Sequence, residues 1–223
     1  MDAHPPLRSF GRIKSRPIKP RQAALMDSLL PGLRVPQNPF DPIGLMPSAV
    51  EVWLEIGFGG GEHMASQGQQ RPDVLILGAE PFQNGVASVL RHIDEAGLTN
   101  VRLHDGDVRD MISHLPNGCL DRVFILFPDP WPKARHQKRR LLTTEMVTSL
   151  ARILKLGGRL RFATDWADYA DWTLERVLAC NLFDWPARRS VDWTDPPGDH
   201  ITTRYEEKRL GDCSPVFLDF VRV

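Results

Sequence analysis

Acidic residues stand at the ends of the predicted strands, and they are the side chains best placed to do chemistry. Glu55, Glu80, Asp107, Asp129 and Asp165 each close or follow a different strand. The carboxyl ends of parallel strands meet at one edge of a sheet, where ligands of such sheets bind, so these carboxylates should line one site. A row of negative charges repels phosphates and attracts a cation, and we therefore expect a positively charged ligand there.

A glycine-rich turn that begins at Gly57 follows the first predicted strand. Glu62 replaces the third glycine of a dinucleotide-binding turn, and the Lys-Ser/Thr pair of a P-loop is missing. With Glu55 before it, the turn suits a cation that carries a ribose, such as S-adenosylmethionine. Glu80 follows at about the 20-residue spacing at which an acid binds ribose hydroxyls, and Asp107 would lie beside the adenine edge. The alternative for the turn alone is a structural bend.

The segment of residues 127–141 combines an acid, an aromatic side chain and a run of cations. Three prolines stiffen the chain around Asp129, because proline fixes φ and reduces loop entropy. Trp131 is suited to stack on a base, with core packing as the alternative. We expect phosphate contacts from the cations that follow, which are Lys133, Arg135, Lys138, Arg139 and Arg140.

Lys+Arg and Asp+Glu both number 28, which gives a formal net charge of +0, but the positive charges are concentrated in two segments. Besides residues 133–140, the first 21 residues carry a cationic cluster against a single acid, Asp2. A polyanion such as RNA would fit two cationic clusters on an acidic body, whereas a solvated tail and a solvated loop are the alternative. The first cluster comprises Arg8, Arg12, Lys14, Arg16, Lys19 and Arg21.

Strands that alternate with helices predict a mostly parallel sheet with helices on both faces. Residues 1–35 are polar and basic, so we expect a flexible arm followed by a single domain of residues 36–223. Helices are expected around residues 86–93, from Thr143 to the glycines at 157–158, and over 166–180. The predicted strands span residues 50–56, 74–77, 101–103, 123–127, 160–163 and 216–221.

Several protein classes are disfavoured by composition. The longest apolar run, residues 123–127, falls far short of the ~20 residues of a membrane helix. The three cysteines are widely spaced and odd in number, which fits neither a zinc site nor a disulfide framework. The beginning of the chain has no pattern of a secretory signal. We therefore expect a cytoplasmic protein without a metal.

The sequence closely resembles the bacterial tRNA (guanine-N7-)-methyltransferases over nearly its whole length. The segment 127–141 and the final Thr-x-x-Glu are specific to that family, whereas the glycine turn is shared with class I methyltransferases in general. Residues 8–12 are also similar to the family's N-terminal arm. The other matching pieces are Glu55-Ile-Gly57-Phe-Gly, Glu80, Asp107, Thr164-Asp165-Trp166 and Thr203-Arg204-Tyr205-Glu206.

The resemblance implies a Rossmann-like class I methyltransferase fold with a seven-stranded sheet. It implies transfer of the methyl group of S-adenosylmethionine to N7 of a guanine in the tRNA variable loop. It assigns Glu55, Glu80, Asp107 and Asp129 to the cofactor. We also expect Gly57 of the glycine turn to contact the cofactor, and Asp129 to be the catalytic residue. The resemblance assigns the tRNA guanosine to Lys133, Asp165, Thr203, Arg204, Tyr205 and Glu206. We expect a monomer or homodimer without an obligate protein partner.

Guanine N7 already carries a lone pair, so this reaction needs no general base. A fixed carboxylate, Asp129 or Asp165, would stabilise the charge that develops on the ring. Glu206 first, or Asp165, would accept hydrogen bonds from guanine N1–H and N2–H, and Tyr205 or Trp131 would stack on the base. Two alternatives remain open: a methyltransferase for another RNA or a small molecule, and an RNA-binding protein on a methyltransferase-like fold. The basic clusters disfavour a small molecule, and the complete set of acids disfavours a binding protein.

Overall fold

The computed structural model describes residues 17–223, and within them one sheet has the strand order β3-β2-β1-β4-β5-β7-β6. Only β7 runs antiparallel to its neighbours, β5 and β6, so the mostly parallel seven-stranded sheet is confirmed. The strands are β1 (Glu51–Ile56), β2 (Val74–Ala79), β3 (Val101–His104), β4 (Leu120–Leu126), β5 (Leu154–Thr164), β6 (Phe183–Asp184) and β7 (Val216–Arg222).

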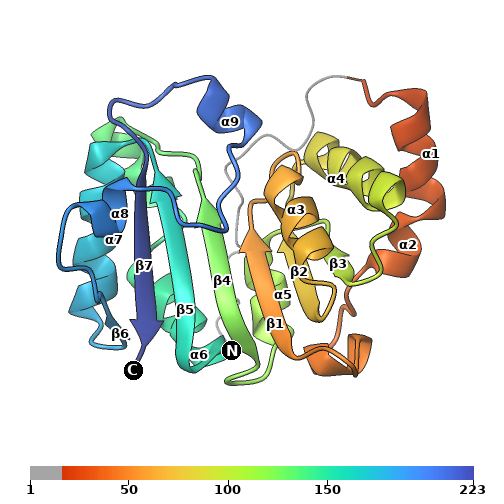
Figure 1. Cartoon of the computed structure of the whole chain (residues 1–223), viewed down its shortest axis with the longest axis horizontal. Coiled ribbons are helices and arrows are strands. Elements are labelled where there is room, and N and C mark those ends of the chain that lie inside the picture. The colour runs from red at the N-terminus through yellow and green to blue at the C-terminus, as the bar shows by residue number, and fades with distance from the viewer. Residues whose placement is uncertain (1–16) are drawn as a thin grey trace.

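Helices cover both faces of this sheet, as predicted (Figure 1). The shorter helices α3 and α5 were not predicted. None of the helices in the described part of the chain is long and apolar enough to cross a membrane. The helices are α1 (Pro20–Ser28), α2 (Leu30–Leu33), α3 (Glu62–Gln70), α4 (Gln83–Ala96), α5 (Val108–His114), α6 (Thr144–Ile153), α7 (Ala167–Ala179), α8 (Val191–Thr194) and α9 (Arg204–Glu207), with short 3-10 turns at Pro42–Leu45 and Ala134–Arg139.

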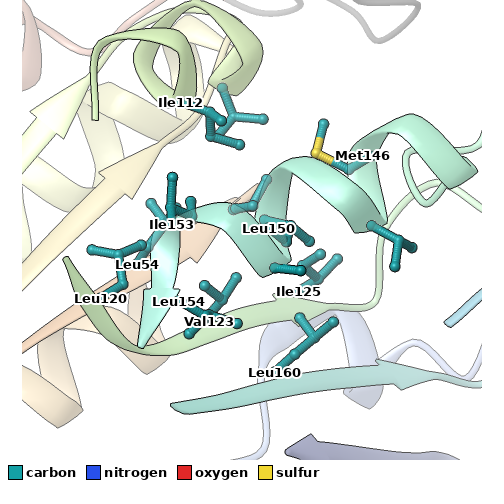
Figure 2. Close-up of a cluster of buried hydrophobic side chains, with 14 of the residues drawn as sticks. Leu54, Ile112, Leu120, Val123, Ile125, Met146, Leu150, Ile153, Leu154 and Leu160 are labelled. Carbon is teal, nitrogen blue, oxygen red and sulfur yellow. The ribbon is translucent and has the colours of Figure 1, made fainter. Parts of the chain in front are cut away.

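Two apolar cores, one on each face, hold these layers together. On one face, side chains of α2, α3 and α4 pack against Trp53, Ile76 and Phe124 of the strands. On the other, α5, α6 and α7 supply the apolar side chains, and Figure 2 shows Leu150 of α6 close to Ile125 of β4. Central strands that are buried on both faces read as continuous apolar runs, and β2 is buried throughout.

The N-terminal segment differs from the prediction of a flexible arm through residue 35. The helices α1 and α2 lie against α4 and β3, and Leu30 and Leu33 are buried in the core. Arg21 forms ion pairs with Asp94 and Glu95 of α4. Leu25, Met26 and Leu29 are partly buried against the apolar core, so the packed body begins near Pro20. Residues 1–16 of the predicted arm lie outside the described residues.

The end of α6 also differs from the prediction that glycines 157–158 would close it. Leu154 follows Ile153 directly in an extended conformation and pairs with Leu120 of β4. Burial of Leu154 in the sheet ends the helix early. Gly158 then lies inside β5, where an added Cβ would approach the carbonyl oxygen of Lys155 to 2.9 Å. The two glycines therefore belong to an irregular strand and not to a helix cap.

Candidate functional site

The glycine turn between β1 and α3 offers open backbone at the carboxyl edge of the sheet. Gly57 and Gly59 have φ values of 72° and 54°, in the region that favours glycine. A Cβ added at either position would meet no atom within 4 Å. Gly61, in contrast, serves packing, because a Cβ there would collide with Val89 of α4. The first two glycines thus leave room for a ligand to reach the backbone.

Glu80 fastens this turn to the end of β2. Its Oε2 accepts a hydrogen bond from the Gly59 N–H and its Oε1 accepts one from the Phe82 N–H, both at 2.9 Å. Burial raises the pKa of Glu80 above its ordinary value, and the negative charges of Asp129 and Glu55 raise it further. Each oxygen of the ionised carboxylate retains acceptor capacity, so a ribose could still bind here.

Glu55 is buried on β1 and is joined to a residue that the sequence analysis missed. Its Oε2 lies 2.7 Å from Nδ1 of His63, on the first turns of α3. No hydrogen-bond partner of Oε1 occurs among residues 17–223. One side of the carboxylate is therefore fixed by the protein while the other can receive a ligand. In the sequence, the only feature that draws attention to His63 is that it directly follows Glu62.

Asp107 follows β3 and caps α5. Its Oδ1 accepts a hydrogen bond from the Arg109 N–H at 3.0 Å, and its Oδ2 forms an ion pair with the Arg109 side chain at 2.8 Å. The residue therefore has a local structural role at the predicted edge of the sheet. Contact with an adenine edge stays a prediction.

Asp129 lies in a strained loop immediately after β4. Phe127 and Trp131 on either side of it have φ values of 51° and 45°, a conformation that costs non-glycine residues about 1–3 kcal/mol. Asp129 is exposed and has no hydrogen-bond or ion-pair partner among residues 17–223. Partial desolvation by the surrounding loop raises its pKa. A loop that holds an unpaired carboxylate near Glu80 is suited to meet a cation.

The cations of the segment 127–141 fall into two groups. Lys133, Arg135 and Lys138 are exposed and fit the predicted phosphate contacts. Arg140 does not, because its side chain is only 1% exposed. It donates to the carbonyl oxygen of Pro130 at 2.9 Å and forms an ion pair with Asp168 of α7.

Arg140 therefore stabilises the loop from its buried side. Its guanidinium also lies over the rings of Tyr169 and Trp172, at 4.7 and 4.9 Å from their centroids. Trp131 is half-buried between Arg139, whose guanidinium is 4.9 Å from the ring centroid, and the edge of His136. The stacking role predicted for Trp131 would thus require a base to share the ring with these neighbours.

Asp165, directly after β5, holds the segment of residues 205–211 in place. Its Oδ2 accepts a hydrogen bond from the Gly211 N–H at 3.0 Å, and its Oδ1 accepts one from the Tyr205 hydroxyl at 3.3 Å. A Cβ on Gly211 would collide with Asp165. Tyr205 also packs on Phe127 with ring centroids 5.6 Å apart, which brings α9 to the loop of Asp129.

The predicted Thr-x-x-Glu motif forms the start of α9. The Thr203 hydroxyl accepts from the Glu206 N–H while Glu206 Oε2 accepts from the Thr203 N–H, the reciprocal arrangement of a capping box. Glu206 Oε1 lies 2.8 Å from Nε2 of His200. Burial alone would raise the pKa of Glu206, but the bonds from His200 and Thr203 outweigh it and lower the pKa.

Both oxygens of Glu206 are thus engaged within the protein, so its predicted contact with a guanine edge would use remaining lone pairs or require these bonds to open. Arg204, on the outer side of α9, reaches Glu62 of α3 at 3.3 Å. Two groups of predicted residues, one around the glycine turn and one around α9, therefore lie against each other across α3 and the loop of Asp129.

Comparisons with known proteins identify close relatives. A family model described as "Putative methyltransferase" matches residues 49–217. The tRNA (guanine-N(7)-)-methyltransferase of Caulobacter vibrioides (strain NA1000 / CB15N) is 65% identical over 219 residues, which cover 98% of this chain and 96% of that protein. The protein of the same name from Rhodospirillum rubrum is 44% identical over 223 residues, covering 96% and 88%.

Solved structures share the fold at low sequence identity. The 16S rRNA methyltransferase KamB matches with a TM-score of 0.56 and 16% identity, over 81% of this chain and 92% of that one. A 16S rRNA (adenine(1408)-N(1))-methyltransferase from Catenulisporales acidiphilia, solved with its cosubstrate SAM, matches with a TM-score of 0.56 and 18% identity, over 82% and 92%. At these identities the likeness concerns the fold alone.

Proposed function

The chain belongs to the tRNA (guanine-N(7)-)-methyltransferase family, and we infer from this membership that it is an enzyme that methylates N7 of a guanine in tRNA. The observation that carries this conclusion is the 65% identity over 98% of the chain. The methyl acceptor is a guanine of the tRNA variable loop in this proposal. Since the reaction acts on tRNA, we place the enzyme in the cytoplasm.

S-adenosylmethionine is the proposed methyl donor, and the residues present fit it. Gly57 and Gly59 leave open space above the turn, Glu55 precedes the turn, and Glu80 accepts a hydrogen bond from the Gly59 N–H. These groups would hold the ammonium and the ribose of the donor, with Asp107 beside the adenine. When bound, the donor supplies an electrophilic methyl group on a positively charged sulfur.

The protein's own residues supply position and charge. Guanine N7 has a lone pair and no proton, so no side chain has to act as a general base. Asp129 would stabilise positive charge near the reacting atoms, and because no residue of the described range 17–223 pairs with it, those residues leave its charge available. Tyr205 would stack on the guanine, while Asp165 holds Tyr205 through its hydroxyl. Most of the acceleration would come from fixing donor and acceptor in line.

Exposed cations beside this site would bind the tRNA backbone. Lys133, Arg135 and Lys138 project from the loop that carries Asp129. Phosphate contacts orient a nucleic acid without reading its sequence, so selection of one guanine must come from the fold of the tRNA and the base pocket. Binding at this surface would therefore depend strongly on salt.

The test is nucleoside analysis after reaction with methyl-labelled S-adenosylmethionine. Bulk tRNA that lacks 7-methylguanosine is offered beside ribosomal RNA as a second substrate. We expect label in 7-methylguanosine from tRNA only. Label in another nucleoside, or in ribosomal RNA alone, would replace this proposal by the alternative of a methyltransferase for another RNA.

A further inference from the structure

We propose that His63 and Gln67 of α3 are positioning residues that set Glu55 for the methyl donor and anchor the segment of residues 199–206 for the guanosine. The inference rests on the proposed function and concerns residues to which neither the sequence motifs nor the family resemblance assigns a role. It follows from a continuous series of buried hydrogen bonds that joins the two groups of predicted site residues.

The series begins at Glu55. Nδ1 of His63 lies 2.7 Å from Glu55 Oε2, and both side chains are at most 5% exposed. The His63 ring is also held edge-on against Phe124 of β4, with centroids 5.0 Å apart. A hydrogen bond and a ring contact thus fix the imidazole in two directions. The carboxylate orientation of Glu55 depends on this ring.

Gln67, one turn later on α3, continues the series. Its amide nitrogen lies 3.3 Å from His63 Nε2 and donates to the backbone carbonyl oxygen of Asp199 at 2.6 Å. Because Nδ1–H of His63 donates to Glu55, Nε2 is the acceptor that the second amide hydrogen requires. Each hydrogen of the NH₂ group therefore has one acceptor, and the carbonyl of Asp199 excludes the flipped amide.

The segment of residues 199–206, to which Gln67 is bound through Asp199, carries the predicted guanosine residues. In Figure 1 the chain leading to α9 passes in front of β5 and β4, at the side of α3. The Asp199 side chain forms ion pairs with Arg161 and Arg122, and the next residue, His200, binds Glu206 at 2.8 Å. The hydrogen bonds of His63, Gln67 and His200, together with the peptide bond from Asp199 to His200, connect Glu55 to the capping box of α9.

This arrangement has a consequence for the reaction. The methyl group and N7 must be aligned closely, and a misplacement of about 1 Å can cost on the order of 10²-fold in rate. Through His63 and Gln67, one face of α3 positions both Glu55, which is assigned to the donor, and residues 199–206, which are assigned to the acceptor. Loss of the Gln67 amide would leave the carbonyl of Asp199 and Nε2 of His63 without their donor while Glu55 and His63 stay paired.

The experiment compares Gln67→Met with Gln70→Ala in the full-length enzyme. Methionine preserves length and volume without a hydrogen-bond donor. Gln70 is the matched control, because it is exposed on the same helix and, among residues 17–223, its amide donates only to Ser66. The readouts are the Kd for S-adenosylmethionine by calorimetry, the KM for tRNA, and amide hydrogen exchange over residues 199–206.

For Gln67→Met we expect a KM for tRNA raised about fivefold, the equivalent of one lost hydrogen bond, with faster exchange over 199–206 and a donor Kd within about twofold of wild type. His63→Phe should weaken both donor and tRNA binding. Equal changes in donor Kd and tRNA KM for Gln67→Met, or an unchanged donor Kd for His63→Phe, would overturn the proposal and mark the pair as core packing.

These readouts keep the inference separate from the proposed function. Donor binding and amide exchange require no tRNA, so they decide on the link between Glu55 and residues 199–206 by themselves. If wild-type protein formed no 7-methylguanosine, the proposed function would fail while the exchange data still supported or refuted the link. If Gln67→Met did not fold, Gln67→Leu, another apolar side chain of similar volume that lacks the donor, would take its place with the same expected results.

Discussion

Among the single residues of the site, the carboxylates differ in the partners that they bind within the protein. Glu80, Asp107, Asp165 and Glu206 bind backbone groups of the protein, and Glu55 binds His63. Asp129 has no partner of this kind among residues 17–223. Its charge is therefore the one that a bound ligand could use fully.

Asp129→Asn should reduce kcat by about 10²-fold or more, because it removes the carboxylate that stabilises charge near the reacting atoms. The raised pKa shows that the protein disfavours the ionised form, so neutralisation should leave the melting temperature unchanged or higher. Single-turnover kinetics and thermal unfolding measure the two effects. Asp171→Asn, at an exposed position of α7, is the control. Wild-type turnover in Asp129→Asn would refute the assignment.

The raised pKa of Glu80 predicts a pH dependence of donor binding. Burial is the main cause and the charges of Asp129 and Glu55 add to it, so Glu80 takes up its proton at a higher pH than an ordinary glutamate. Ribose hydroxyls donate hydrogen bonds to the ionised carboxylate, so affinity for S-adenosylmethionine should fall as pH falls through this raised pKa, and binding there should release protons. In the unliganded protein the native state holds more protons than the unfolded state between the ordinary and raised pKa values, so stability should fall as pH rises through that range.

Calorimetry between about pH 5 and pH 8, in buffers of different ionisation enthalpy, measures both the affinity and the protons released. Glu80→Gln should bind the donor weakly and with a flatter pH profile. A wild-type affinity that stays constant over this range would contradict the role of Glu80 as an ionised ligand.

At the scale of elements, α4 supports the glycine turn through close packing. A Cβ on Gly85 would collide with the carbonyl oxygen of Gly59. Gly85→Ala should therefore displace the turn, weaken donor binding, and destabilise the fold by about 1–3 kcal/mol. Gly32→Ala in α2 is the matched control, because a Cβ there meets nothing within 4 Å.

Thermal unfolding and donor calorimetry separate the two glycine variants. The control should keep its donor affinity and gain slightly in stability, since alanine favours a helix more than glycine does. A Gly85→Ala protein with wild-type donor affinity would show that the turn tolerates movement.

Elements with a strong pattern were predictable from the sequence, and elements decided by tertiary packing were not. The apolar runs predicted the central strands, and the helix expected around residues 86–93 is α4. The helix α1 was not predicted because its sequence is weakly periodic and its packing against α4 is a long-range contact. The end of α6 was wrong because pairing of Leu154 with Leu120 is a long-range contact that no local signal announces.

The same division holds for the site. The motif positions predicted which acids follow the strands, because parallel topology fixes where strand ends meet. The bonds of Asp165 to Gly211 and of Glu55 to His63 depend on packing across the sheet edge and could not be predicted. Arg140 looked like its exposed neighbours in sequence, yet packing against Tyr169 and Trp172 buries it.

At the scale of the whole molecule, charge distribution should govern tRNA binding. Lys133→Ala should weaken binding and lower the slope of log affinity against log salt by about 0.7–0.9 for one lost phosphate contact. Salt titrations of tRNA binding measure this slope, with Lys155→Ala as the control, since Lys155 pairs with Asp121 at the opposite end of the sheet. An unchanged slope for Lys133→Ala would argue against a phosphate contact.

Deletion of residues 1–16 removes Arg8, Arg12, Lys14 and Arg16. The packed body should survive this deletion, because α1 begins at Pro20. We expect the KM for tRNA to rise more than the KM for donor, with little change in melting temperature. Equal increases in both KM values would mean that the segment supports the fold instead of contacting tRNA.

Donor binding depends on the acids at the carboxyl edge of the sheet, which should hold a cationic methyl donor next to Asp129. A crystal structure of the enzyme with S-adenosylmethionine shows directly whether they do. We expect the donor above Gly57 and Gly59, its ribose at Glu80, its ammonium group at Glu55 and its sulfonium on the side of Asp129. A donor bound elsewhere, or bound with these carboxylates turned away from it, would refute this arrangement.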